Sequence, residues 1–203
     1  FIANEGSADF GAVLERLAAG EYDCVAAAVT VTPEREHTVA FLPPYVISGQ
    51  GLAVDTVRLP QVRSIDDLSG LTVGVQRGDT SESIAGHLLA QGRVAHVRVY
   101  DCGAVGTAVA DLTAGGCDAV LKLAPALSRL VSQVPNVEIV QSGGIATEQI
   151  AVAVNPADQT LLARLQVAQA ELEEDDIFDF SSGYIQRSKA IMPNNAVNFP
   201  WRL

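Results

Sequence analysis

The sequence is poor in cysteine, and the three that occur follow no metal-binding spacing. Cys102 and Cys117 flank an expected helix of about ten residues, roughly 15 Å long, which is too far for a disulfide. Unpaired cysteines are usually buried in folded proteins. We therefore expect Cys24, Cys102 and Cys117 to be buried or partly buried free thiols.

Basic residues and long apolar runs are also scarce. The chain has 13 Lys and Arg against 24 Asp and Glu, a formal charge of -11. Nucleic-acid backbones and anionic lipids both require clustered cations, so this composition argues against either partner. The longest strictly apolar stretch, CVAAAV, is far short of a membrane span, which favours a soluble piece of protein. The opening residues FIANEGS resemble the tail of a strand, so we expect upstream sequence that carries any signal peptide or lipid anchor.

Catalytic motifs are absent as well. His37, His87 and His96 are isolated, with no HExxH motif and no nearby nucleophile, so metal hydrolysis and Ser or Cys triads have no local support. We expect each histidine to be exposed or half-buried. GSADFG and GLTVGVQRG lack the glycine spacing of phosphate-binding loops. The sequence therefore predicts no enzyme, no metal and no cofactor.

What the sequence does contain is an alternation of strands and helices. Strands are expected at residues 71–75, 94–100, 118–122 and 137–141, with helices at 80–91, 104–114 and 125–133 between them. This spacing predicts an α/β fold with a mostly parallel sheet covered by helices.

Further elements flank this region. A helix is expected at residues 8–19, capped by Ser7 and ended by Gly20, and then a strand buried on both faces in YDCVAAAV. TVAFLPPY and VISGQGLAV are expected to be extended. A strand at 148–155, a helix at 159–174 and a short helix near 177–187 follow. The apolar stripe expected for the 159–174 helix is Leu161, Leu162, Leu165 and Leu172.

The stretch TVTPEREHTVAF predicts a one-turn helix with Thr32 as its cap and Pro33 at its first position. This places Arg35 in the first turn, where the helix dipole disfavours a cation. A guanidinium has a planar fork of donors that suits a carboxylate. The sequence leaves two interpretations open, a ligand carboxylate or an internal ion pair with one of the chain's acids.

A second candidate site is VGVQRGDTSESIAGHLL. A buried strand ends at Val75, and Thr80 or Ser81 begins a helix whose free amide groups could bind an anion. The alternative is an ordinary Ser/Thr cap between a strand and a helix.

Three segments in this order carry a family resemblance: LAAGEYDCVAAAVTVTPEREHTVAFLPPYVISGQGLAV, IDDLSGLTVGVQRGDTSESIA and AVADLTAGGCDAVL. Together they resemble the family 3 extracellular solute-binding proteins, the polar amino-acid receptors of ABC importers, from about residue 10 to 155. The resemblance implies a two-lobed periplasmic-binding-protein-like clamshell of type II. Each lobe would be a mixed sheet flanked by helices, and the first elements of lobe 1 would be missing from this sequence.

The resemblance also implies boundaries and site residues. Lobe 1 would comprise residues 1–52 and 153–203, lobe 2 would comprise 56–148, and the crossings would fall near 52–55 and 149–153. Arg35 would bind the ligand carboxylate. The other implied ligand-binding residues are Thr30 and the backbone of Ala28 beside Arg35, Thr80 and Ser81 in the second lobe, and Gln76 as a side-chain contact.

One position departs from the family pattern. The strand after CDAV usually ends in an Asp that pairs with the ligand ammonium, but this chain has Leu123 there, preceded by Lys122. A buried ammonium without a counter-charge costs about 3–5 kcal/mol. Either another acid, Asp79 or Glu148, replaces it, or the solute is uncharged or anionic and contacts Lys122. A solvated lysine at the rim is the remaining interpretation of Lys122.

The function that the resemblance implies is capture of a small carboxylate-bearing solute, an amino acid or a related compound, for an ABC importer. The partners would be the solute and the membrane subunits of the importer. The location would be periplasmic or extracellular, with or without a lipid anchor. The alternatives on the same fold are a cyclohexadienyl-dehydratase-like enzyme and the ligand-sensing module of a receptor.

Overall fold

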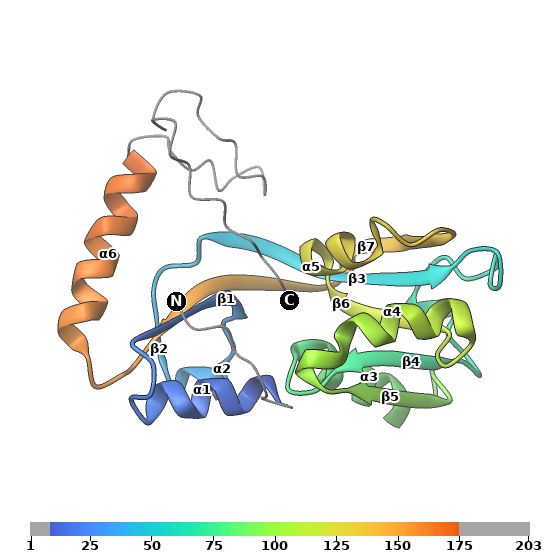
Figure 1. Ribbon diagram of the computed structural model, residues 1–203, viewed down its shortest axis with the longest axis horizontal. Helices are drawn as coiled ribbons and strands as arrows, with labels where there is room; N and C mark the ends of the chain where they lie inside the picture. Colours follow the sequence, from blue (N-terminus) through green and yellow to red (C-terminus); the bar gives the residue numbers. More distant parts are fainter. Residues whose placement is uncertain (1–8, 175–203) are drawn as a thin grey trace.

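The computed structural model describes residues 9–174 of the 203 (Figure 1). Ser7, the helix expected near 177–187 and the rest of residues 175–203 lie outside the described residues. The helices are α1 (Phe10–Ala18), α2 (Pro33–Glu36), α3 (Thr80–Ala90), α4 (Val105–Ala114), α5 (Ala124–Val131) and α6 (Gln159–Glu174), with 3-10 turns η1 (Ile65–Asp67) and η2 (Cys102–Ala104). The strands are β1 (Cys24–Thr30), β2 (Ala40–Phe41), β3 (Val46–Asp55), β4 (Thr72–Gln76), β5 (His96–Tyr100), β6 (Ala119–Leu123) and β7 (Val137–Val154).

All strands belong to one sheet in the order β1-β7-β3-β6-β4-β5, with β2 also paired to β7. The prediction of a mostly parallel sheet is wrong, because only β4 pairs in parallel, with β5 and β6, while β1, β2, β3 and β7 join through antiparallel pairs. The alternating pattern correctly identified the parallel unit of β4, β5 and β6. It could not reveal that β3 pairs with β6 in the antiparallel direction. The fold is therefore α/β with a mixed sheet flanked by helices.

Two long strands, β3 and β7, connect two groups of elements (Figure 1). The first group is α1, β1, α2 and β2, and it pairs with β7 at residues 150–154. The second group is β4, β5, β6, α3, α4 and α5, and it pairs with β3 at residues 50–54. The expected strands at 137–141 and 148–155 are thus parts of one strand, which continues through Gly143 and Gly144, both at positive φ (85° and 74°).

The first group has its own small core. Val13, Leu14 and Leu17 of α1 are buried against Val25 and Val29 of β1. The expected apolar face of this helix is confirmed, but its cap is Asp9, whose carboxylate accepts a hydrogen bond of 2.7 Å from the Gly11 N–H. Asp9 stands directly before the first helical residue, whereas Ser7 is two residues too early to cap it.

The expected burial of β1 on both faces is wrong. Cys24 is exposed, as are the three alanines at 26–28, so most of this strand presents only one side to the core. Among the described residues β1 pairs with β7 alone, as an edge strand does. The sequence criterion for a buried strand is a continuous apolar run. Small apolar residues such as these alanines satisfy it even where the strand is exposed. The expectation holds for Cys117, which is buried, and for Cys102, which is half-buried.

The second group contains the larger core. Its two apolar clusters lie on either side of the sheet, one including Leu52, Val73 and Leu121, the other including Leu112, Val120 and Leu127. The ranges of α3, α4 and α5 agree with the expected helices within two residues. α3 begins shortly after the end of β4, and α5 begins directly after β6. The polar residues described below lie at these strand ends.

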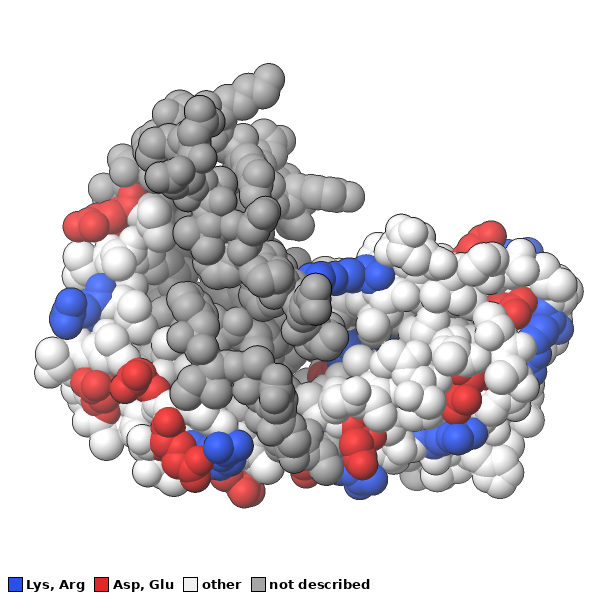
Figure 2. Space-filling model, viewed as in Figure 1, with Lys and Arg blue, Asp and Glu red and all other residues white. Residues whose placement is uncertain are grey.

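α6 spans the predicted 159–174, but none of residues 159–172 is buried, and Leu172 is 39% exposed. A hydrogen bond of 3.0 Å from Gln169 Nε2 to the Pro43 carbonyl connects it to the loop before β3. Within residues 9–174, no helix combines the length and apolarity that a membrane crossing needs. On the face in Figure 2, Lys and Arg side chains stand apart from one another among acidic and uncharged residues.

Candidate functional site

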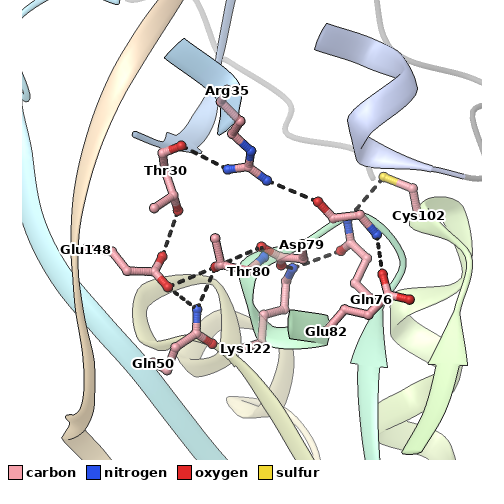
Figure 3. A network of polar contacts seen from close by, with 11 residues as sticks. Thr30, Arg35, Gln50, Gln76, Asp79, Thr80, Glu82, Cys102, Lys122 and Glu148 are labelled. Atoms are coloured by element: carbon pink, nitrogen blue, oxygen red, sulfur yellow. Dashed lines mark hydrogen bonds and ion pairs between the residues drawn. The ribbon is translucent and has the colours of Figure 1, made fainter. Parts of the chain in front are cut away.

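The two groups meet at a polar network formed by residues from β1, α2, β3, β4, α3, β6 and β7 (Figure 3). From the first group come the end of β1 and the TPER helix α2. From the second group comes the loop between β4 and α3. The same loop meets α1, because the Phe10 N–H donates a hydrogen bond of 3.3 Å to the Arg77 carbonyl.

Arg35 lies on the short helix α2, as predicted. The Thr32 hydroxyl caps this helix by accepting a hydrogen bond of 3.3 Å from the Arg35 N–H. The guanidinium then donates to one carbonyl in each group, with Nη1 2.9 Å from the Thr30 oxygen and Nη2 3.0 Å from the Gly78 oxygen. Within residues 9–174 it forms no ion pair within 4 Å, so the alternative of an internal salt bridge is not what the structure contains.

The Arg35 guanidinium is partly desolvated. Burial lowers its pKa, while the nearby carboxylates of Asp79 and Glu148 act in the opposite direction. Arginine remains charged in proteins despite such shifts. The ring of Phe10 lies 5.4 Å from the guanidinium carbon and covers part of it. Arg35 is therefore a fixed positive charge whose donors now serve only neutral carbonyls.

Glu148 is the buried carboxylate of the network. It comes from β7, is only 7% exposed and accepts three hydrogen bonds. The Thr30 hydroxyl donates to Oε2 at 2.7 Å, and the Gln50 amide and the Thr80 hydroxyl donate to Oε1 at 2.7 and 2.8 Å. All three donors are neutral, and in the described part of the chain no Lys, Arg or His forms an ion pair with this carboxylate.

Lys122 and Asp79 form a buried ion pair in the same network, because Asp79 Oδ1 also accepts a hydrogen bond of 2.9 Å from the Thr80 N–H. Lys122 Nζ donates to Asp79 Oδ2 and to Gln76 Oε1, both at 2.8 Å, and the Gln76 amide donates to Cys102 Sγ at 3.3 Å. Lys122 is only 9% exposed, so its interpretation as a solvated lysine at the rim is wrong. Lys122 and Gln76 can meet because they lie at the ends of the neighbouring parallel strands β6 and β4.

Of the expected site residues, the structure brings Thr30, Arg35, Gln76, Thr80 and Lys122 into this one network (Figure 3). Ser81 lies next to Thr80 but is fully buried, and its hydroxyl has no hydrogen-bond partner among the described residues. Ala28 is not joined to the network. It is exposed, has a positive φ of 53°, and its backbone hydrogen-bonds the Tyr45 side chain.

The sequence did not single out Gln50 or Cys102, and it named Asp79 and Glu148 only as substitutes for Leu123. A signal for Gln50 existed: a long polar side chain between two glycines, Gly49 and Gly51, in the mainly apolar β3. A Cβ at Gly49 would lie 2.6 Å from the Ala146 carbonyl oxygen, so glycine lets β7 approach closely enough for Glu148 to reach Gln50. Leu123 itself is buried opposite Gln50, and no acid occupies that position.

The network can therefore offer donors to an anion at Arg35 and acceptors to a cation at Glu148. No group of three or more potential metal-ligating side chains occurs within residues 9–174. The three histidines are all exposed, as expected, and none belongs to the network. The chemistry at this junction is hydrogen bonding and charge recognition.

Solved structures with this fold define its class. This chain is similar to an ancestral arginine-binding protein bound to arginine, with a TM-score of 0.75, 31% identity and coverage of 83% of this chain and 73% of that chain. It is also similar to holo ArgBP from T. maritima, with a TM-score of 0.71, 28% identity and coverage of 81% and 70%. The fold is that of the two-lobed amino-acid-binding proteins.

The chain belongs to the bacterial extracellular solute-binding proteins, family 3, whose family model matches residues 6–195. It is 29% identical over 163 residues to the L-cystine-binding protein TcyJ of Escherichia coli K12, covering 80% of this chain and 59% of that protein. It is 24% identical over 179 residues to the ABC transporter arginine-binding protein 1 of the same strain, covering 83% and 68%. The chain thus spans 59% of the length of the cystine-binding relative.

Proposed function

We propose that this chain captures a small carboxylate-bearing solute, an amino acid or a close relative, between two lobes and delivers it to an ABC importer. Family membership and the similarity to an L-cystine-binding protein and an arginine-binding protein support this proposal. They also support a periplasmic or extracellular location and the importer's membrane subunits as partners.

The observation that carries the proposal is the state of Arg35. A half-buried guanidinium normally pairs with an acid, because desolvating a charge without a counter-charge is costly. Here its two hydrogen bonds go to neutral carbonyls, one from each group. A ligand carboxylate would replace these carbonyls with a bidentate pair between two charged groups, which adds the attraction of opposite charges to the hydrogen bonds. Arg35 is thus the anchor for the solute, with Thr30, Gln76, Thr80, Ser81, Lys122 and the backbone of Ala28 as further contacts.

The division into lobe 1 (1–52 and 153–203) and lobe 2 (56–148) belongs to the same proposal. The strand pairing supports one crossing in β3 and one in β7, but it favours slightly earlier positions than residues 52–55 and 149–153. Residues 52–54 already pair with β6 of the second group, and residues 150–154 already pair with the first group. The register of β3 shifts between Gly49 and Gly51, which makes these glycines the better crossing in that strand.

Capture would work by a shift between open and closed arrangements of the lobes. A ligand can stabilise the closed form only if it touches both lobes at once. Arg35 and Thr30 contribute from the first group, and Thr80 contributes from the second. The bond from Arg35 to Gly78 joins the first group to the loop of the second at the same point.

The dehydratase-like alternative needs a carboxylic acid that donates a proton to a leaving group. Glu148 is the buried acid at the junction, but both of its oxygens accept hydrogen bonds. That arrangement suits a receptor for positive charge better than a proton donor. We therefore favour a binding protein over an enzyme.

A thermal-shift screen of the full chain against amino acids, dicarboxylates and amines tests the proposal. A ligand at a hundred times its dissociation constant should add about 2.7 kcal/mol of stability. We expect Arg35→Ala to abolish the shift. Arg77→Ala is the matched control, because Arg77 lies near the site but pairs at the surface with Asp101 at 2.9 Å. Equal shifts in the Arg35→Ala variant and the unchanged chain would reject the proposed anchor.

A further inference from the structure

We propose that Glu148, on the long strand β7, binds the ammonium group of the solute in place of an acid at the end of β6. This inference rests on the proposed function and makes it more specific. The solute would be a zwitterion, with its carboxylate on Arg35 and its ammonium on Glu148. A carboxylate solute without an amino group would then be a poor ligand.

The first support is that Glu148 is buried without a direct ion pair among the described residues, although Arg35 lies near enough to interact with it electrostatically. Buried carboxylates are normally paired with a cation, because neutral hydrogen bonds offset only part of the desolvation cost. Glu148 is 7% exposed, and its three partners are two hydroxyls and an amide. Among residues 9–174 no cation of the chain forms an ion pair with it. A cation from the solute would supply the missing partner.

The second support is that the other acids at the junction already have partners that satisfy them. Asp79 pairs with Lys122 at 2.8 Å, so its charge is balanced within the protein. Glu82 is only half-buried, so water offsets part of its charge, and it accepts a hydrogen bond of 2.7 Å from the Gly78 N–H. The residue at the end of β6, Leu123, is apolar and buried. Glu148 is the acid left to receive a positive group.

The third support is the connection between Glu148 and Arg35. Thr30 joins them, because its carbonyl accepts from Arg35 at 2.9 Å while its hydroxyl donates to Glu148 at 2.7 Å (Figure 3). One threonine therefore lies between the positive and the negative group. The carboxylate and ammonium of an α-amino acid are themselves attached to a single carbon. Arg35 and Glu148 thus each contact the same threonine, which places a positive and a negative group near each other at one point of the network.

The fourth support is an unused acceptor in the same cluster. Gln50 is fully buried, and its amide nitrogen donates to Glu148 and to Thr80 at 2.7 and 3.1 Å. Its Oε1 has no hydrogen-bond partner among the described residues. An ammonium group has three donors and cannot be satisfied by one carboxylate oxygen. Gln50 Oε1 provides a further acceptor beside Glu148.

The test is a calorimetric comparison of two solutes, an amino acid that stabilises the full chain and its deaminated analogue, which keeps the side chain and the carboxylate. The unchanged chain should prefer the amino acid. Glu148→Gln should weaken amino-acid binding by at least about 30-fold, the equivalent of losing one partner of a buried charge pair, and leave the analogue within about threefold. Glu148→Asp, which keeps the charge, should retain the preference.

The matched control is Glu138→Gln, the same substitution at an exposed position of the same strand. It should change neither affinity. If Glu148→Gln binds both solutes as the unchanged chain does, or loses both equally, the inference is wrong while the role of Arg35 stands. If Arg35→Ala also binds both solutes normally, the proposed function fails with it. If Glu148→Gln does not fold, loss of the preference in Glu148→Asp would overturn the inference.

Discussion

The guanidinium of Arg35 donates a hydrogen bond of 3.0 Å to the carbonyl oxygen of Gly78, 43 residues further along the chain and in the other group of elements. This bond connects the helix that presents the proposed anchor to the loop that precedes α3. Because the acceptor is neutral, a carboxylate can compete for the same donor by adding the attraction of an opposite charge. Arg35 therefore both connects the two groups and serves as the proposed anchor of the solute.

Gly78 also sets how closely the two groups approach. Its φ is +73°, and a Cβ there would lie 2.0 Å from Asp9 Oδ1 and 2.7 Å from the Gly11 nitrogen. Gly70→Ala is the matched control, because Gly70 has a φ of +79° but nothing within 4 Å of the added atom. We expect Gly78→Ala to cost about 1–3 kcal/mol more than Gly70→Ala in urea unfolding, from overpacking. Equal losses would show that the two groups do not meet at this loop.

The buried pair of Lys122 and Asp79 should be important for stability. Their side chains are 11% and 14% exposed, and removing one partner leaves the other charge unpaired. We expect Lys122→Met to cost about 3 kcal/mol in urea unfolding, and the double variant with Asp79→Leu to be more stable than either single variant. The exposed pair of Arg93 and Asp66 is the control, where Arg93→Ala should cost at most about 1 kcal/mol. Additive losses at Lys122 and Asp79 would argue against their coupling.

Alkaline pH should destabilise the second group. Burial raises the pKa of the Cys117 thiol above its ordinary 9.0, and burial together with the hydrogen bond to Asp111 raises the pKa of Tyr100 above 10.0. The folded state therefore holds these protons more tightly than the unfolded state, and this contribution is complete below pH 9 and falls as the pH rises further. Urea unfolding at pH 7 and pH 10 should show lower stability at pH 10. Tyr100→Phe should reduce the difference, and an unchanged difference would contradict the assignment.

The three thiols should react in the order of their exposure. Cys24 is exposed, Cys102 is half-buried and Cys117 is buried. Burial also raises the pKa of Cys102, which lowers its fraction of reactive thiolate. Alkylation at pH 8 followed by mass spectrometry should label Cys24 first and Cys117 last. Rapid labelling of Cys117 in the native chain would show that the packing around it is looser than described.

Local sequence patterns predicted the elements whose signals lie within a few residues. The TPER helix, its Thr32 cap and the position of Arg35 follow from Pro33 and from capping chemistry, and the helices of the second group follow from their apolar periodicity. The network around Glu148 depends instead on which strands lie side by side. Glu148 meets Gln50 because β7 pairs with β3 across 98 residues of sequence, and no local pattern encodes that pairing.

The central claim is that Arg35 anchors the carboxylate of the solute. The most direct measurement is isothermal titration calorimetry of the unchanged chain and the Arg35→Ala variant with the amino acid that gives the largest thermal shift. Loss of a buried, charge-assisted pair should weaken binding by at least about 30-fold, while Arg77→Ala should stay within about twofold. Binding by Arg35→Ala within twofold of the unchanged chain would contradict the claim.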